Sequence, residues 1–207
     1  MDLLSHPLYF APVPFYAQLY KAETLLVASE DPFVKQTFRN RTVIATENGT
    51  QNLTIPVVHD GGRTAMKDIR ISEHGNWRHQ HWNAIVSAYR KSPFFEYYAD
   101  DFAHFYEERD GFLMDFNMRL HTVVSELLGL ERDVRLLSAG DVDAVTAVDV
   151  RSVAEPKALA AMQCAGGQPY YQVFAQRNGF IPSLSIVDLL FNTGPEGLLV
   201  LRDSVRG

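Results

Sequence analysis

The chain contains a single cysteine, no cluster of basic residues and no long apolar run. Because Cys164 stands alone, no disulfide can form within the chain, as is typical of proteins in a reducing compartment. The formal net charge of −6 at pH 7 argues against nucleic acids and anionic membranes, which are recruited by basic surfaces. No segment approaches the roughly 18 uninterrupted apolar residues that a transmembrane helix requires.

The amino-terminal segment also lacks the features of a secretory signal. No basic region precedes it, and Asp2, His6 and Pro7 interrupt any apolar run. We therefore expect a soluble, cytoplasmic protein with no nucleic-acid partner and no membrane span. The sequence specifies neither a cofactor nor an oligomeric state.

Common catalytic motifs are missing as well. The chain has no Gly-x-Ser-x-Gly elbow, Walker loop or Gly-x-Gly-x-x-Gly sequence, so hydrolase, P-loop and dinucleotide-binding functions lack support. His74, His79 and His81 are poorly spaced for zinc, and no acidic cluster accompanies them, so we predict no metal site. Cys164 lies in a stretch of small residues, which favours an incidental cysteine over a nucleophile.

The composition is that of an ordinary globular protein. The 207 residues are 46% hydrophobic, 21% charged and 12% aromatic. A chain of this length can bury roughly 70% of its unfolded surface, and we expect one domain over residues 1–207. The aromatic clusters fit a packed core better than a sugar-stacking wall, although both interpretations stay open.

Two β-prone runs around Asn48-Gly49 give the clearest signal in the first third of the chain. Thr42–Thr46 and Leu53–Val57 flank this turn, and we predict that they pair as an antiparallel hairpin. Three further elements are expected in the same third of the chain or just beyond it: a helix over Phe15–Ala22, a strand over Thr24–Ala28 and a strand over Ala65–Ile71.

The middle of the chain is predicted to be helical. Apolar residues recur at helical spacing in Trp77–Arg90 and in Phe112–Leu130, and the second helix should stop near Gly129. Between them, Ser92-Pro93 combines a capping residue with a proline for the first turn, which predicts the start of another helix.

Residues 131–168 contain few aromatic residues and many Asp, Ala and Val residues. We expect a strand over Val134–Leu137 and an extended or mobile crossover over residues 141–168, because few large apolar side chains offset the entropy of ordering. Ile186–Phe191 fits a helix or a strand, and Leu198–Leu201 a terminal strand. The predicted fold class is α/β, with α+β as the alternative: a β-rich N-terminal third with a hairpin, central helices, and a C-terminal strand packing back on the sheet.

Four blocks of sequence carry a specific order and spacing between about residues 4 and 200. They are Pro12-Val13-Pro14-Phe15-Tyr16; Phe38-Arg39-Asn40-Arg41 with Leu53-Thr54-Ile55-Pro56-Val57; Lys67-Asp68-Ile69-Arg70-Ile71 with His81-Trp82 and Ser92-Pro93-Phe94-Phe95; and Pro169-Tyr170-Tyr171-Gln172 with Ser185-Ile186-Val187-Asp188-Leu189-Leu190-Phe191-Asn192. In these blocks the chain resembles the WbqC-like protein family, particularly its longer, Bacteroidetes-type members. Many shorter members open with a Gln-Pro-Tyr-type sequence, where this chain has His6-Pro7-Leu8-Tyr9. The resemblance implies a role in surface-polysaccharide (O-antigen type) or modified-sugar biosynthesis.

Asn40, Arg41 and Lys67 are the candidate ligand-binding residues near predicted strands. If these strands are neighbours, the three side chains converge at one sheet edge, where arginine offers a planar fork and lysine a point charge. Such a site suits a small anionic molecule such as a sugar nucleotide or an acyl donor. The alternative is that Arg41 and Lys67 are surface residues paired with acids.

Asp188 and Asn192 are four residues apart and would share one face of a helix. Asp188, or else His81, is the candidate catalytic group for proton transfer, and Asn192 the candidate ligand-binding partner. The structural alternative is that Ser185 caps the helix, Asp188 completes a capping box and Asn192 lies at the helix end.

Two functions remain open from the sequence. One is a transferase that uses an activated sugar or acyl donor, and the other is a non-catalytic binding or scaffolding protein of the same pathway. Under the first, Arg41→Ala should weaken an anionic ligand by about 1.5–3 kcal/mol. The same change should alter stability by less than about 0.5 kcal/mol.

Overall fold

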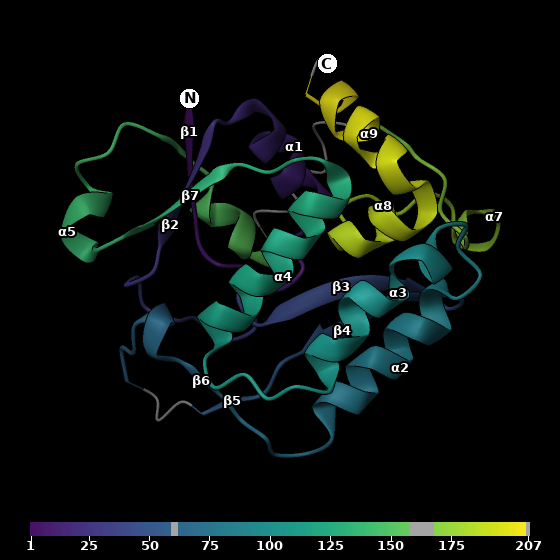
Figure 1. The fold of residues 1–207 in the computed structure, drawn as a ribbon, viewed down its shortest axis with the longest axis horizontal. Coiled ribbons are helices and arrows are strands. Elements are labelled where there is room, and N and C mark those ends of the chain that lie inside the picture. Colours follow the sequence, from purple (N-terminus) through teal and green to yellow (C-terminus); the bar gives the residue numbers. More distant parts are fainter. Residues whose placement is uncertain (59–61, 158–167, 206–207) are drawn as a thin grey trace.

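Residues 1–58, 62–157 and 168–205 are described by the computed structural model of the chain (Figure 1). The fold class is α/β, as predicted, and its centre is a four-stranded sheet of order β7-β2-β1-β8, in which all neighbours are parallel. Its strands are β1 (Asp2–Ser5), β2 (Thr24–Ala28), β7 (Asp133–Leu137) and β8 (Val148–Asp149). The strands predicted over Thr24–Ala28 and Val134–Leu137 are thereby confirmed.

The strand order creates a change of direction next to β1. The chain proceeds from β1 to β2 and then to β7 on one side, and it returns with β8 on the other side of β1. At such a switch point the connections after the two flanking strands diverge, which leaves a crevice at the carboxyl ends of the strands. The ends of β1 and β8 are therefore the expected place for a ligand.

Successive side chains along the strands pack alternately into two apolar layers, one on each face of the sheet. Leu3 and Leu25 belong to the main core, whereas Leu4 and Leu26 face a smaller cluster with Val142. This period of two follows from the pleat of a strand. Helices that contribute to the main core include α1 (Val13–Lys21), α4 (Leu113–Leu128) and α8 (Ile186–Thr193), and α5 (Ala139–Val142) contributes to the smaller cluster.

Helix α4 runs through the middle of the molecule (Figure 1). Its residues Leu113, Phe116, Leu120 and Val124 are completely buried, which reflects the helical spacing of the sequence. The helix ends where Gly129 adopts a φ of 63°, a left-handed conformation that glycine takes without steric strain. The predicted stop near Gly129 is confirmed.

The predicted hairpin forms, but in a different register. Strand β3 (Arg41–Thr46) pairs antiparallel with β4 (Gly49–Thr54), so that Thr42 faces Leu53 and Thr46 faces Gly49. The expected partner segment, Leu53–Val57, was therefore wrong by about four residues. The turn lies at Glu47-Asn48, because Gly49 supplies the positive φ of 114° that closes it.

The two central helices are α2 (Trp77–Tyr89) and α3 (Phe95–Ala103). The predicted cap of α3 was wrong, because the helix begins after Phe94 and the buried Ser92 hydroxyl has no hydrogen-bond partner within the described residues. The turn before α3 instead uses backbone bonds, including Phe95 N–H to the Ser92 carbonyl at 3.2 Å.

Two predicted strands were wrong. Leu198–Leu201 lies within a helix, α9 (Gly197–Asp203), which contacts α1 instead of joining the sheet. A short apolar run does not by itself distinguish strand from helix. Ala65–Ile71 forms a 3-10 helix (Met66–Asp68) and then β6 (Arg70–Ile71), which pairs with β5 (Val57–Val58).

The segment predicted as a crossover contains β8 and a 3-10 helix (Arg151–Ala154). Val150 and Val153 of this segment enter the main core. Residues 158–167 lie outside the described residues, so mobility of the whole segment stays a prediction. A four-residue helix, α7 (Ala175–Asn178), follows further along the chain. Within the described ranges, no helix is both long and apolar enough to cross a membrane.

Candidate functional site

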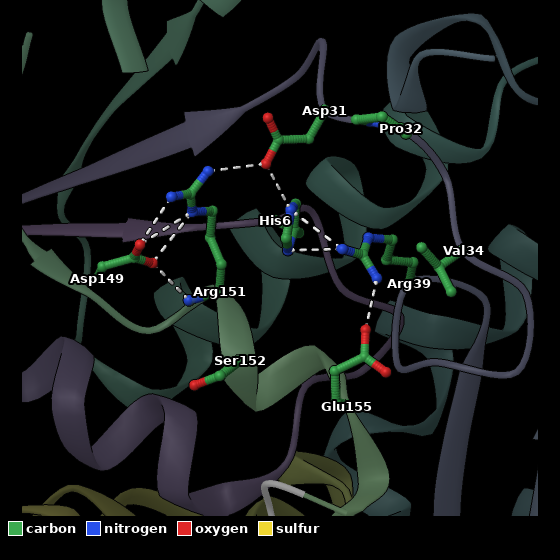
Figure 2. Close-up of a pocket in the computed structure, with 9 residues that line it drawn as sticks. All are labelled: His6, Asp31, Pro32, Val34, Arg39, Asp149, Arg151, Ser152 and Glu155. Atoms are coloured by element: carbon green, nitrogen blue, oxygen red, sulfur yellow. Dashed lines mark hydrogen bonds and ion pairs between the residues drawn. The ribbon is translucent and has the colours of Figure 1, made fainter. Parts of the chain in front are cut away.

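A cavity of about 550 Å³ opens at the carboxyl ends of the parallel strands, next to the switch point between β1 and β8. Its volume lies within the range of small-molecule sites. We call it the strand-end pocket (Figure 2), and it is lined by His6, Asp31, Pro32, Val34, Arg39, Asp149, Arg151, Ser152 and Glu155.

The ends of two adjacent strands place an imidazole against a carboxylate. His6 is the first residue after β1, and Asp31 follows the end of β2. His6 Nε2 lies 2.8 Å from Asp31 Oδ2. The Asp31 backbone carbonyl accepts a hydrogen bond from Met66 N–H at 2.9 Å, which fixes this loop.

Arg151 connects two carboxylates directly after β8. Its Nη2 donates to Asp149 Oδ2 at 2.7 Å, and its Nη1 donates to Asp31 Oδ2 at 3.0 Å. The Arg151 backbone N–H also donates to Asp149 Oδ1 at 2.9 Å, which holds the start of the 3-10 helix. The hydrogen bond from Arg151 lowers the pKa of Asp149, so this carboxylate is ionised at neutral pH.

Arg39 is the most deeply placed charge of the pocket and is only 5% exposed. Its Nη1 donates to Thr37 Oγ1 at 3.2 Å and to Glu155 Oε1 at 3.4 Å, and its backbone carbonyl accepts a hydrogen bond from Asn117 of α4 at 2.7 Å. Its Nε–H has no acceptor among the described residues. Such a buried, unpaired donor is uncommon and leaves a place for an acceptor from a ligand or water.

His6 is neutral in this setting. Burial and the adjacent Arg39 guanidinium lower the pKa of His6 to about 4. Arg39 Nη2 lies 3.1 Å from His6 Nδ1. Arg39 Nη2 is also 3.1 Å from His6 Nε2, and the tautomer with its proton on Nε2 lets Nε2 donate to Asp31 while Nδ1 accepts from Arg39.

The ionic groups of the pocket form one continuous chain of contacts (Figure 2). Its order is Asp149, Arg151, Asp31, His6, Arg39 and Glu155. Guanidinium groups match phosphate and carboxylate oxygens, and carboxylates accept hydrogen bonds from hydroxyl or ammonium groups. The arrangement can therefore hold a small polar molecule that carries an anion.

Asn40 and Arg41, which precede the predicted strand, both form hydrogen bonds with residues at the end of the hairpin or just after it. Asn40 is buried, and its Nδ2 donates to the Ile55 carbonyl at 3.0 Å. Arg41 begins β3, and its Nε donates to Thr54 Oγ1 on β4 at 3.3 Å. A ligand-binding role for either residue stays untested.

Lys67 forms an ion pair with Glu30, the residue before Asp31 in the chain. It lies in the 3-10 helix Met66–Asp68, whereas Arg41 lies in the β3–β4 sheet. The sequence predicted that the two side chains converge at the edge of one sheet if their strands are neighbours. They do not, because Lys67 lies outside any strand. The pairing with Glu30 fits the alternative of a surface ion pair.

Asp188 is completely buried in α8. Tyr170 Oη donates to Asp188 Oδ2 at 2.7 Å, and Gln172 Nε2 donates to the same atom at 3.1 Å. Burial raises the pKa of Asp188 to about 6, although hydrogen bonds from Tyr170, Tyr89 and Gln172 lower it. We call Asp188, Tyr170, Gln172 and Tyr89 the Asp188 cluster.

The neighbours of Asp188 on α8 have mostly structural contacts. Ser185 caps the helix, because its Oγ accepts a hydrogen bond from Val187 N–H at 3.4 Å. Asn192 Nδ2 donates to the Asp188 carbonyl at 2.8 Å, so the two residues share one face as predicted. Asn192 and Tyr170 also line a second cavity of about 340 Å³.

His81 belongs to an aromatic cluster of the main core. Its Nδ1 lies 2.9 Å from the Tyr9 hydroxyl, which in turn lies 2.8 Å from the Tyr106 hydroxyl. Burial lowers the pKa of His81 to about 4. His81 and Asp188 thus lie in the interior, and their predicted roles in proton transfer stay untested.

The described parts of the chain hold no metal-binding arrangement of three or more acidic, histidine or cysteine side chains. His79 contacts Asn83 whereas His81 contacts Tyr9, so these two histidines diverge on α2. Cys164 lies outside the described residues.

The residues of the strand-end pocket are not among the candidate site residues predicted from the sequence. One signal was available, because His6 and Asp31 follow segments with strand character. Arg39 stood within the block Phe38-Arg39-Asn40-Arg41, but nothing in the sequence marked it as the buried arginine. Asp149 and Arg151 were hidden because β8 has only two residues and no hydrophobic pattern of its own.

Comparison with known proteins identifies the family to which the chain is similar. A sequence profile of the WbqC-like protein family matches residues 6–172, a range that contains every residue of the strand-end pocket. An uncharacterised protein of Mycobacterium tuberculosis is 26% identical over an alignment of 206 positions, and this alignment spans 87% of this chain and 88% of that protein. No solved structure matches the chain.

Proposed function

The chain belongs to the WbqC-like protein family, and we propose that it acts in surface-polysaccharide or modified-sugar biosynthesis by binding an anionic small molecule in the strand-end pocket. The observation that carries this proposal is the meeting of Arg39 and Arg151 in a cavity at the topological switch point of a parallel sheet. A sugar nucleotide or an activated acyl donor is the ligand class proposed, because phosphate and carboxylate groups match guanidinium donors.

The two arginines offer different kinds of contact. Arg151 is 29% exposed, so its donors are within reach of a ligand that enters from solvent. Arg39 lies at the bottom of the pocket, where its donors face a less hydrated environment. Charge-assisted hydrogen bonds are stronger where water is excluded, so we expect each bond from Arg39 to contribute more to affinity than each bond from Arg151. The more exposed Arg151 should contribute more to the first contact with a ligand that enters from solvent.

Group transfer is the reaction class that we propose for this pocket. Neutral His6, held between Asp31 and Arg39, is the group placed to move a proton there. Asp188 and His81 would need a rearrangement of the core before a ligand could reach them, so His6 is the stronger candidate.

A non-catalytic binding protein of the same pathway is the second candidate. It is favoured by the internal pairing of the pocket, since Arg151 and Arg39 already have carboxylate partners within 3.4 Å. A site neutralised in this way can hold a ligand without activating a reacting group. The two candidates share the ligand and differ only in turnover.

Thermal-shift measurements with sugar nucleotides and acyl donors test the proposal. A ligand present at 100 times its dissociation constant should stabilise the protein by about 2.7 kcal/mol. Arg151→Ala should weaken that ligand by about 1.5–3 kcal/mol. Turnover of a ligand that binds would then separate the enzyme from the binding protein.

Arg177→Ala is the matched control. Arg177 is also an arginine in an ion pair, with Glu47, but it lies in α7 next to the hairpin turn. We expect this variant to bind the ligand as the wild type does. Equal binding by wild type and Arg151→Ala would refute the strand-end pocket as the ligand site.

A further inference from the structure

The charges of the strand-end pocket do not balance for a purely anionic ligand. Three carboxylates, from Asp31, Asp149 and Glu155, face two guanidinium groups, from Arg39 and Arg151. His6 adds no charge at pH 7, because burial and Arg39 lower its pKa to about 4. The pocket therefore carries one excess negative charge before any ligand enters.

Apart from Arg39 Nε–H, which has no acceptor among the described residues, an anion entering this pocket meets arginine groups that already contact carboxylates. Arg151 directs its donors at Asp149 and Asp31, and Arg39 Nη1 contacts Glu155. Each ligand oxygen that takes such a donor leaves a carboxylate less well paired. In a partly desolvated pocket, like charges that approach without a counter-charge oppose binding.

The pocket also has acceptors to offer. Asp31 uses Oδ2 for both His6 and Arg151, and its Oδ1 accepts no hydrogen bond within the described residues. Glu155 likewise uses Oε1 for Arg39, whereas its Oε2 accepts none from the described parts of the chain. These two carboxylates lie on either side of His6 and Arg39 (Figure 2).

We infer that the ligand of the strand-end pocket carries a primary ammonium group beside its anion, with the anion at Arg39 and Arg151 and the ammonium at the carboxylate of Asp31 or of Glu155. This inference rests on the proposed function and narrows its ligand to a zwitterion. Amino sugar phosphates and amino acids share this chemistry. Their ammonium group offsets the negative charge that the anion alone would add to the pocket, fully in an amino acid and in part in an amino sugar phosphate.

A hydroxyl group could also donate to these carboxylates, so the decisive comparison is amine against hydroxyl. Both groups form charge-assisted hydrogen bonds with a carboxylate, but only the ammonium adds the Coulomb attraction between opposite charges. We expect the amine member of a matched pair to bind about ten times more tightly than the hydroxyl member. A tenfold change corresponds to about 1.4 kcal/mol.

Titration calorimetry with two matched pairs of probes tests the inference. Glucosamine 6-phosphate is compared with glucose 6-phosphate, and alanine is compared with lactate. Tighter binding of the amine in the first pair identifies an amino sugar phosphate, and in the second pair an amino acid. Glu155→Gln or Asp31→Asn should reduce the preference for the amine, whereas Glu47→Gln, which alters a surface acid paired with Arg177, should not.

The outcomes separate the inference from the function on which it rests. Equal binding of amine and hydroxyl probes, still lost in Arg151→Ala, would overturn the zwitterion and leave the anion site standing. A preference for the amine that survives both Glu155→Gln and Asp31→Asn, each with an unchanged melting temperature, would also overturn it. Binding of none of the four probes by the wild type would count against both proposals.

Discussion

The strand-end pocket and the Asp188 cluster both place carboxylates beside hydrogen-bond donors, but they differ in how far these carboxylates are exposed to water. Asp31, Asp149 and Glu155 remain partly exposed around an open cavity, and each is paired with a charged arginine. Asp188 is fully buried, and its partners Tyr170 and Gln172 are neutral. The first arrangement can exchange its internal partners for a ligand, whereas the second stabilises the packing of α8.

The Asp188 cluster shows why a sequence motif is not yet a site. Asp188 and Asn192 do share one helix face, as the sequence predicted, but that face points into the core. Asp188 Oδ2 accepts hydrogen bonds from Tyr170 and Gln172, whereas Asp188 Oδ1 and Asn192 Oδ1 have no partner among the described residues. The pocket residues, by contrast, follow the ends of parallel strands, where backbone geometry presents them to solvent.

Acid should destabilise the protein through three buried histidines, of which one lies in the strand-end pocket, and should stabilise it through Asp188; the net loss is the largest effect we expect. Burial lowers the pKa of His6, His81 and His121 from 6.5 to about 4, so the unfolded chain binds more protons than the folded chain between these values. Stability therefore falls as the pH drops through this window. Asp188, with its pKa raised from 3.8 to about 6, opposes the trend because its folded form takes up the proton.

Three imidazoles outweigh one carboxyl group, and we expect a net loss on the order of 4 kcal/mol between pH 7 and pH 5. Urea unfolding at the two pH values measures it. His6→Asn should make the loss smaller, and Asp188→Asn should make it larger. An unchanged unfolding midpoint between pH 7 and pH 5 would contradict the neutral, buried state of these histidines.

Removal of the Asp188 side chain should have the next largest effect. Asp188→Ala leaves buried donors of Tyr170 and Gln172 without an acceptor, and we expect a loss of about 3 kcal/mol in unfolding free energy. Asp188→Asn, which keeps the shape, should lose less. If Asp188→Ala instead retained full stability and lost ligand binding, the Asp188 cluster would be the functional site.

Arg39 should affect both stability and ligand binding, because it is buried like Asp188 but lines the strand-end pocket. Arg39→Ala removes contacts with Thr37, His6 and Glu155, and we expect a stability loss of about 2 kcal/mol together with loss of ligand binding. Arg151→Ala should lose binding with a smaller change in stability, since Arg151 is more exposed. Chemical denaturation and calorimetry on both variants measure the two quantities.

The smallest effect is expected for the surface ion pair of Lys67 and Glu30. Its side chains are exposed, where solvent screens the attraction and ordering two long side chains offsets it. Lys67→Ala should leave the melting temperature and ligand binding essentially unchanged. A clear loss of binding in this variant would extend the functional site from the strand-end pocket toward Lys67, as the sequence had suggested.

Local sequence patterns predicted much of the fold. The buried run Thr24–Ala28, the amphipathic helix that ends at Gly129 and the hairpin around Asn48-Gly49 follow from side-chain periodicity and from glycine's conformational freedom. Where the patterns were short or ambiguous, tertiary packing decided: Leu198–Leu201 is helical because it packs against α1, although its residues suit a strand equally well.

The sequence by itself determined the family, the α/β class and the residues that pack the core, because these depend on periodicity and on order along the chain. Only the tertiary structure decided which charged residues meet. His6, Asp31, Arg39 and Arg151 come from segments up to 145 positions apart, and a parallel sheet brings them to one edge. That edge exists because β8 returns beside β1, a pairing that two residues of strand sequence do not encode on their own.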